Sequence, residues 1–300
     1  MATHNHTGPA DLSGVNRAFI VGIVLNLLFV VVEFGAGFFL NSLALISDAG
    51  HNLSDVASLA LAMLAFRLAK VKPNQTFTYG LRKSTILISL FNAVILLIVI
   101  GAIAWESLGR LKEPLHVQGD YMAVVAGIGI IINAVTAMLF FKNRKKDLNI
   151  KGAFLHLAAD ALVSLGVVVA GVVIGITAWY WLDTAVSFAI VIVILVSTWG
   201  LLRDSTILAL DGVPRGIDLE KVRIAILSSK EIKDVHHIHV WAMSTTENAL
   251  TAHIVVANDF PLSAFEPLKA AIQKSLLVQN IHHSTLEIEL TGEPCKSIEF

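Results

Sequence analysis

The sequence lacks several features of ordinary soluble and secreted proteins. Its 300 residues include one cysteine, Cys295, so no disulfide can form within the chain and a disulfide-stapled secreted scaffold is excluded. Only 15% of the residues are charged and 55% are hydrophobic, whereas soluble domains carry about 25% charged residues. This composition also excludes intrinsic disorder. The sequence has no strongly basic patch of the kind that binds nucleic acids. The polar N-terminus lacks the basic region of a cleaved signal peptide.

Long hydrophobic stretches dominate the first two thirds of the chain, each close to the roughly 20 residues that cross a bilayer. They lie at about 17–39, 43–68, 82–107, 120–141, 153–176 and 180–202. Lys and Arg are concentrated in the second and fourth connections between spans, whereas the connections on the other side of the membrane hold only Arg110 and Lys112. Because connections rich in Lys and Arg lie in the cytoplasm, this distribution predicts that both termini are cytoplasmic. We therefore expect a flexible cytoplasmic N-terminus over 1–16 and a six-helix transmembrane domain over 17–205.

The pattern changes after about residue 210, where turn-forming residues precede shorter segments. Beyond Asp204 the chain has 8 Lys and Arg against 12 Asp and Glu, which suits a water-exposed domain. The order of predicted elements, α-β-β-α-β, indicates a small ferredoxin-like α+β domain in the cytoplasm over 206–300. Asp218 is a plausible N-cap of its first helix. The predicted helices are 218–229 and 262–277, and the predicted strands are 235–243, 249–257 and 285–290.

Two matched pairs of ionisable residues lie inside the predicted spans, where a charged side chain costs about 2.5–3.5 kcal/mol. His51 and Asp55 are four residues apart in the second span, and His156 and Asp160 repeat this spacing in the fifth. Residues four apart share a helix face, so facing helices would offer two imidazoles and two carboxylates, a complete tetrahedral set for Zn²⁺. Metal and protons would then compete for the same atoms. The alternative is that each side chain forms a hydrogen bond between helices.

Other polar or small residues in the spans are expected to support helix packing. Asp48 lies three residues before His51. We expect Asp48 to support the metal-binding residues through a packing or hydrogen-bond contact rather than to bind the metal itself. Glu33 is expected near a span end or at a contact between helices. Small residues spaced for close helix approach are Gly166, Gly171 and Gly175.

Histidines are concentrated in the predicted cytoplasmic domain, which holds six of the 11 in the chain. His237 and His239 share one face of the first predicted strand and His236 faces the other way. Ligands could therefore assemble from strand ends, and the alternative is that some of these imidazoles are exposed or structural. The six are His236, His237, His239, His253, His282 and His283.

The stretches 41–55, 77–82 and 156–160 resemble the cation diffusion facilitator family of divalent-metal transporters. The first is similar to its second-helix signature, the second to the cytoplasmic motif that follows, and the third to its fifth-helix motif. The resemblance covers nearly the whole chain. It implies a homodimer that exchanges metal for protons by alternating access. The two His-Asp pairs resemble the zinc-transporting branch, with Cd²⁺, Co²⁺ or Ni²⁺ as further candidate substrates.

The same resemblance extends to the cytoplasmic domain, where 235–241 is similar to the family's tail motif. It implies Zn²⁺ ligation by a set of four residues, with His237 or His283 as substitutes. In the family such ions bridge the dimer, which implies a regulatory role for this set. The implied ligands are His236, His253, His282 and Glu289.

These observations predict a secondary active Zn²⁺/H⁺ antiporter, not an enzyme, in the lipid of a bacterial inner membrane. An intramembrane metallohydrolase would need an open metal position, and the His-Glu-x-x-His motif is absent. A passive metal channel could use the same ligands, but a tight tetrahedral site would bind too firmly for fast conduction. A membrane-anchored metal sensor would leave the site in the spans without a purpose.

Overall fold

The structure is a computed structural model that describes residues 13–141 and 148–292, without the side chains of 13–22, 148–156 and a few positions in 58–66, 139–140 and 262. The chain divides into two compact units. The first unit comprises Met1–Ala60 and Val94–Trp199, and the second comprises Leu61–Ala93 and Gly200–Phe300.

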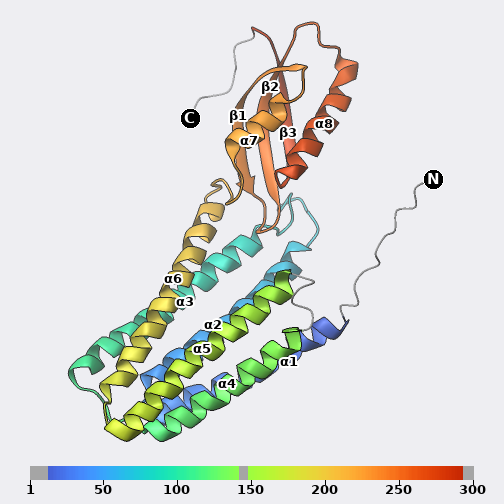
Figure 1. Ribbon diagram of the computed structural model, residues 1–300. Helices are drawn as coiled ribbons and strands as arrows, with labels where there is room; N and C mark the ends of the chain where they lie inside the picture. The colour runs from blue at the N-terminus through green and yellow to red at the C-terminus, as the bar shows by residue number, and fades with distance from the viewer. Residues whose placement is uncertain (1–12, 142–147, 293–300) are drawn as a thin grey trace. The chain divides into compact units, whose positions relative to one another are not determined.

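Six long helices occupy the first 209 residues (Figure 1). They are α1 (Ser13–Phe39), α2 (Leu43–Ala69), α3 (Ser84–Lys112), α4 (Gly119–Phe141), α5 (Leu148–Thr177) and α6 (Trp181–Ala209). Within the described residues, α3, α4, α5 and α6 are long and apolar enough to cross a membrane, and α1 contributes a shorter apolar stretch, Ile23–Phe39. The helical membrane domain is thus confirmed, while the count of six spans stays a prediction for α1 and α2.

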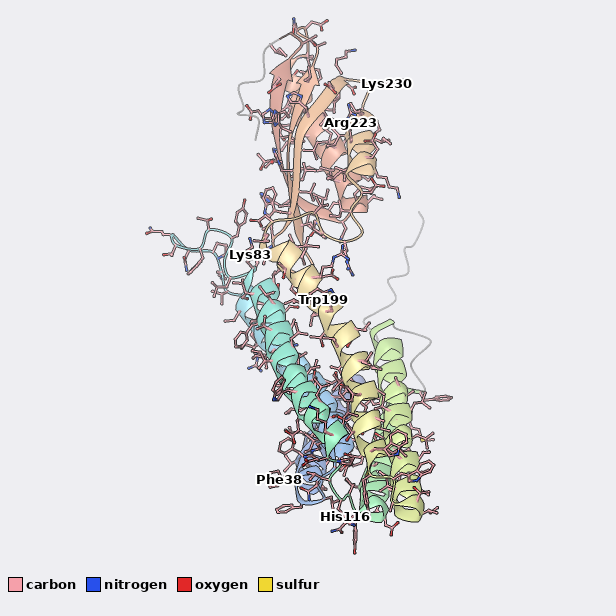
Figure 2. The ribbon with its side chains drawn as sticks, turned by 90° about the vertical axis from the view of Figure 1, so that its left-hand side faces the viewer. Phe38, Lys83, His116, Trp199, Arg223 and Lys230 are labelled. Carbon is pink, nitrogen blue, oxygen red and sulfur yellow. The ribbon has the colours of Figure 1, made fainter. Side chains whose placement is uncertain are left out.

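Apolar side chains lie on both the packed and the outer faces of the first unit. Leu45, Met122 and Val167 belong to a buried core that α2, α3, α4, α5 and α6 share. Phe38 and many other large apolar side chains are exposed, as expected where lipid rather than water is the solvent. Phe38, near the end of α1, and His116, after α3, lie at the same end of this unit (Figure 2).

Helices α4 and α5 approach each other closely because glycines line their contact. A Cβ atom added at Gly171 would lie 2.8 Å from both the backbone nitrogen of Ala123 and the backbone oxygen of Gly119. A Cβ at Gly175 would collide with Oδ1 of Asp120. The expectation of close packing is therefore confirmed at Gly171 and Gly175. It is wrong for Gly166, where a Cβ would meet nothing within 4 Å.

The C-terminal part of the second unit is a two-layer α+β domain. Its elements are α7 (Leu219–Leu227), β1 (Ile232–Ala242), β2 (Asn248–Val256), the 3-10 turn η1 (Leu262–Ala264), α8 (Phe265–Val278) and β3 (Ile281–Leu290). The strand order is β1-β2-β3, with β1 antiparallel and β3 parallel to β2. Both helices contact each other, and their buried side chains share one core with the sheet. The α-β-β-α-β order is confirmed.

Local capping explains where the elements of this domain begin and end. The Asp218 side chain accepts hydrogen bonds from the backbone nitrogens of Glu220 and Lys221, so it is the predicted N-cap of α7. After α8 the chain turns at Asn280, which has a φ of 63°. Strand β3 begins directly afterwards, four residues before its predicted start at Thr285, because it pairs with the whole length of β2.

Candidate metal centres

A histidine and two aspartates gather inside the first unit, from helices α2 and α5. Nε2 of His51 lies 3.3 Å from Oδ1 of Asp160, and Nδ1 of His51 lies 3.9 Å from Oδ2 of Asp55. Each residue can offer one ligand atom, and these three atoms lie within 4.8 Å of one another. Asp160 is buried, whereas His51 and Asp55 are partly accessible. Such a group can hold a divalent cation with mixed nitrogen and oxygen ligands.

The fourth predicted member of this group is His156. Its backbone belongs to α5, one helical turn before Asp160, so both residues lie on the same face of that helix. Its side chain is outside the described residues, and its role as a ligand stays a prediction.

Buried polar residues surround the three-residue group. Oγ of Ser164 on α5 donates to Oδ2 of Asp48 at 2.9 Å, so the aspartate makes a contact between helices, as expected. Nδ2 of Asn52 donates to Oε2 of Glu33 at 3.3 Å, which joins α2 to α1. Both carboxyl groups are completely buried, and Glu33 makes a contact between helices, one of the two expected positions.

A carboxylate that the sequence reasoning missed holds the beginning of α2. Asp183, in the first turn of α6, accepts hydrogen bonds from Oγ of Ser42 at 2.6 Å and from the backbone nitrogens of Leu43 and Ala44 at 2.7 and 3.1 Å. It therefore caps α2 from another helix and satisfies donors that the helix itself leaves unpaired. The sequence feature that indicated this role is the position of Asp183 just inside the start of the sixth predicted span, 180–202.

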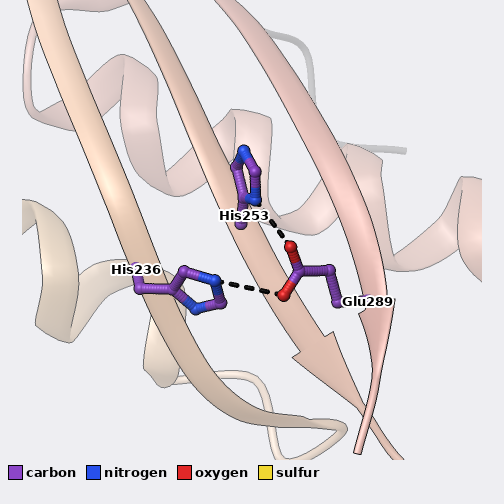
Figure 3. Close-up of side chains that lie close together, drawn as sticks. All are labelled: His236, His253 and Glu289. Carbon is purple, nitrogen blue, oxygen red and sulfur yellow. Dashed lines mark hydrogen bonds and ion pairs between the residues drawn. The ribbon is translucent and has the colours of Figure 1, made fainter. Parts of the chain in front are cut away.

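The second group assembles on the sheet, with one residue from each strand (Figure 3). Nδ1 of His253 on β2 lies 2.7 Å from Oε1 of Glu289 on β3, and Nε2 of His236 on β1 lies 3.1 Å from Oε2 of the same carboxylate. The register explains this contact, because His236 pairs directly with His253. One ligand atom from each residue lies within 4.8 Å of the others.

Two further side chains lie beside this sheet group. Oε2 of Glu287, two residues before Glu289 and thus on the same face of β3, is 3.4 Å from Nε2 of His253. The ring of His237 is centred 5.1 Å from that of His253. His237 has a φ of 48° where the pairing of β1 with β2 shifts register. This bulge turns its ring toward the group, although strict alternation would place His236 and His237 on opposite faces.

The structure does not bring His282 into the sheet group. It lies at the start of β3 and Glu289 near its end, and seven residues of strand span about 23 Å. Nδ1 of His282 instead accepts from the backbone nitrogen of Asn248 at 3.5 Å. The predicted substitute His283 packs edge-on against Tyr79, with ring centres 5.7 Å apart. One strand therefore cannot deliver both predicted ligands to one ion.

Comparisons with known proteins extend over nearly the whole chain. A family model described as the cation efflux transmembrane domain matches residues 19–208, and one described as the cation efflux protein cytoplasmic domain matches residues 214–290. The cation efflux system protein CzcD of Alcaligenes sp. (strain CT14) is 34% identical over 299 residues, which cover 99% of this chain and 92% of that protein.

Two further relatives show similar coverage. The zinc transporter ZitB of Escherichia coli (strain K12) is 32% identical over 299 residues, covering 98% of this chain and 93% of the relative. The cadmium, cobalt and zinc/H(+)-K(+) antiporter of Bacillus subtilis (strain 168) is 32% identical over 288 residues, covering 95% and 91%.

Proposed function

Because the chain belongs to the cation diffusion facilitator family, whose members are metal transporters rather than enzymes, we propose that it exports Zn²⁺ in exchange for protons. The observation that carries this proposal is the meeting of His51, Asp55 and Asp160 between two helices of the membrane unit. His156 completes the proposed transport site, because it lies one turn from Asp160 on the same face of α5. Relatives named for cadmium, cobalt and zinc suggest the range of substrates.

The chemistry of this set suits a proton-coupled carrier. Two aspartates cancel the charge of one divalent ion when both histidines are neutral. The metal-bound site therefore carries no net charge while the helices reorient within the membrane. Imidazole titrates near neutral pH, and protons therefore compete with the metal for the same lone pairs. In the proposed cycle, Zn²⁺ enters from the cytoplasm, the helices reorient, and protons from outside help to release the ion.

The same proposal covers the placement of the chain and its second metal centre. Six spans in a bacterial inner membrane would leave both termini in the cytoplasm, in keeping with the distribution of Lys and Arg. In the cytoplasmic domain, His236, His253 and Glu289 would bind Zn²⁺ and support a homodimer. His282 is left out of this set, since it lies at the other end of β3.

Zinc transport into proteoliposomes tests the function directly. We expect an imposed pH gradient to drive Zn²⁺ uptake by the wild type, and His51→Ala and Asp160→Asn to slow it by more than about tenfold, because loss of even an outer-sphere partner costs about 10–100-fold. Glu106→Gln is the matched control, since this exposed carboxylate pairs with Arg110 away from the site. Uptake that ignores the pH gradient would favour a channel, and unchanged rates in both site variants would refute the proposed site.

A further inference from the structure

Two buried carboxyl groups face each other beside the proposed transport site. Glu33 on α1 and Asp48 on α2 each have a side chain with no solvent exposure. One oxygen of each is satisfied, by Asn52 for Glu33 and by Ser164 for Asp48. The other oxygens, Glu33 Oε1 and Asp48 Oδ1, have no donor among the described residues, and the two groups lie within hydrogen-bonding range of each other.

This arrangement favours one proton shared by the two groups. Two neighbouring carboxylates cannot both be ionised in a low-dielectric interior, because their charges repel and no cationic side chain among the described residues contacts them. The donors that reach the pair, Asn52 and Ser164, are both neutral. Neither orphan oxygen accepts a hydrogen bond from them, so a proton carried by one carboxyl group and accepted by the other completes the contact.

We propose that Glu33 and Asp48 form a proton-binding site that exchanges its proton as metal binds and leaves the neighbouring His51, Asp55 and Asp160 group. The proton forms an O–H bond on one carboxyl group and a hydrogen bond to the other, and it departs to water as H⁺. This inference rests on the proposed antiport, since it assigns one of the exchanged protons to a place outside the metal ligands.

Electrostatic coupling gives the exchange its direction. Asp48 lies about one turn before His51 on α2, and Ser164, which donates to Asp48, lies one turn after Asp160 on α5. The pair therefore lies beside the proposed transport site. A divalent cation bound there adds positive charge next to the carboxyl groups, so binding of the metal and release of the proton are coupled.

Helix α4 adds no charge beside the pair. Helix α4 packs against both α1 and α5. Between Met122 and Phe141 its sequence contains no titratable residue. At Gly129 an added Cβ would lie 2.7 Å from the ring of Phe29 and 3.5 Å from Oγ of Ser164, so α4 seals this side with apolar and small groups. Between Met122 and Phe141, α4 therefore contributes no titratable group to the surroundings of the pair.

Glu33→Gln separates proton exchange from a structural role. A glutamine can accept from Asn52 and donate to Asp48, so it reproduces every hydrogen bond of the protonated glutamic acid but cannot release the proton. A purely structural role predicts wild-type behaviour for this variant. Our proposal predicts that it moves about one proton fewer per Zn²⁺, measured with an entrapped pH dye and a zinc indicator in proteoliposomes. Glu106→Gln is the control with the same chemical change elsewhere.

Infrared difference spectroscopy of the full-length protein in lipid gives a readout that does not depend on transport. Addition of Zn²⁺ to the wild type should remove a carbonyl band of a protonated carboxylic acid, and Glu33→Gln and Asp48→Asn should each lack this change. Unaltered proton-to-zinc ratios and bands in Glu33→Gln would overturn the proposal, as would a wild type without such a band. If the wild type lost the carboxylic-acid band on addition of Zn²⁺ but showed no proton-driven Zn²⁺ transport, the proposed antiport would be refuted and the proton-binding site would be supported.

Discussion

The contact between Asp183 and the start of α2 allows a quantitative prediction about stability. Its carboxylate accepts three hydrogen bonds, from the Ser42 hydroxyl and from the backbone nitrogens of Leu43 and Ala44. All four residues are buried. Hydrogen bonds to a charged group contribute about 1.5–3 kcal/mol each, and a buried donor left without a partner costs about 1–3 kcal/mol. Removal of the buried carboxylate also removes the free-energy cost of burying its charge, which offsets part of this loss of stability.

We therefore expect Asp183→Ala to lower the free energy of unfolding by about 3–5 kcal/mol, because three donors lose their acceptor together. Ser42→Ala is the matched comparison, since it removes the hydroxyl donor and leaves both backbone bonds, and it should cost about 1–2 kcal/mol. The Ser42 hydroxyl also accepts from the backbone nitrogen of Leu45 at 3.2 Å, which accounts for part of its expected cost.

Unfolding of the purified protein by SDS in mixed micelles, followed by circular dichroism, measures these differences. The same samples can be titrated with Zn²⁺, because α2 carries His51 and Asp55 and a displaced helix start would weaken the metal group. A loss of less than about 1 kcal/mol in Asp183→Ala, or equal losses in Asp183→Ala and Ser42→Ala, would refute the capping argument.

Two other predictions concern the sheet group and the glycine contact. His253→Ala should reduce the number of Zn²⁺ ions bound per purified chain, measured by equilibrium dialysis, because it removes one of the two histidines that contact Glu289. His282→Ala should leave the number unchanged. Equal loss in both variants would contradict this assignment. Gly171→Ala should destabilise the protein in the SDS assay because its Cβ meets backbone atoms, while Gly166→Ala, in open space, should stabilise it by about 0.5–1 kcal/mol. The opposite order would contradict the packing argument.

Local patterns were sufficient wherever neighbouring residues decide the structure. The spacing of His51 and Asp55 predicted one shared helix face, and their contact at 3.9 Å agrees with it. The N-cap role of Asp218 and the order of helices and strands in the cytoplasmic domain were predicted from the same short-range signals.

The same patterns failed where segments distant in sequence had to meet. Matching motif positions suggested that His282 and Glu289 bind one ion, but both lie on the single strand β3, which holds them far apart. His237 was expected on the opposite face from His236, and an irregular pairing of β1 with β2 brings their rings to within 5.3 Å. Pairing with another strand, not the strand's own sequence, determines such a bulge.

The sequence by itself determined the membrane character, the α+β tail and the identity of the residues able to bind metal, because hydrophobicity, periodicity and ligand chemistry are properties of short segments. Only the tertiary structure decided which of these residues meet. It placed Asp183 against the start of α2, Glu33 against Asp48, and Glu289 between His236 and His253. These contacts depend on how helices and strands pack across long stretches of chain, where the balance of burial and polar pairing is set by the whole fold.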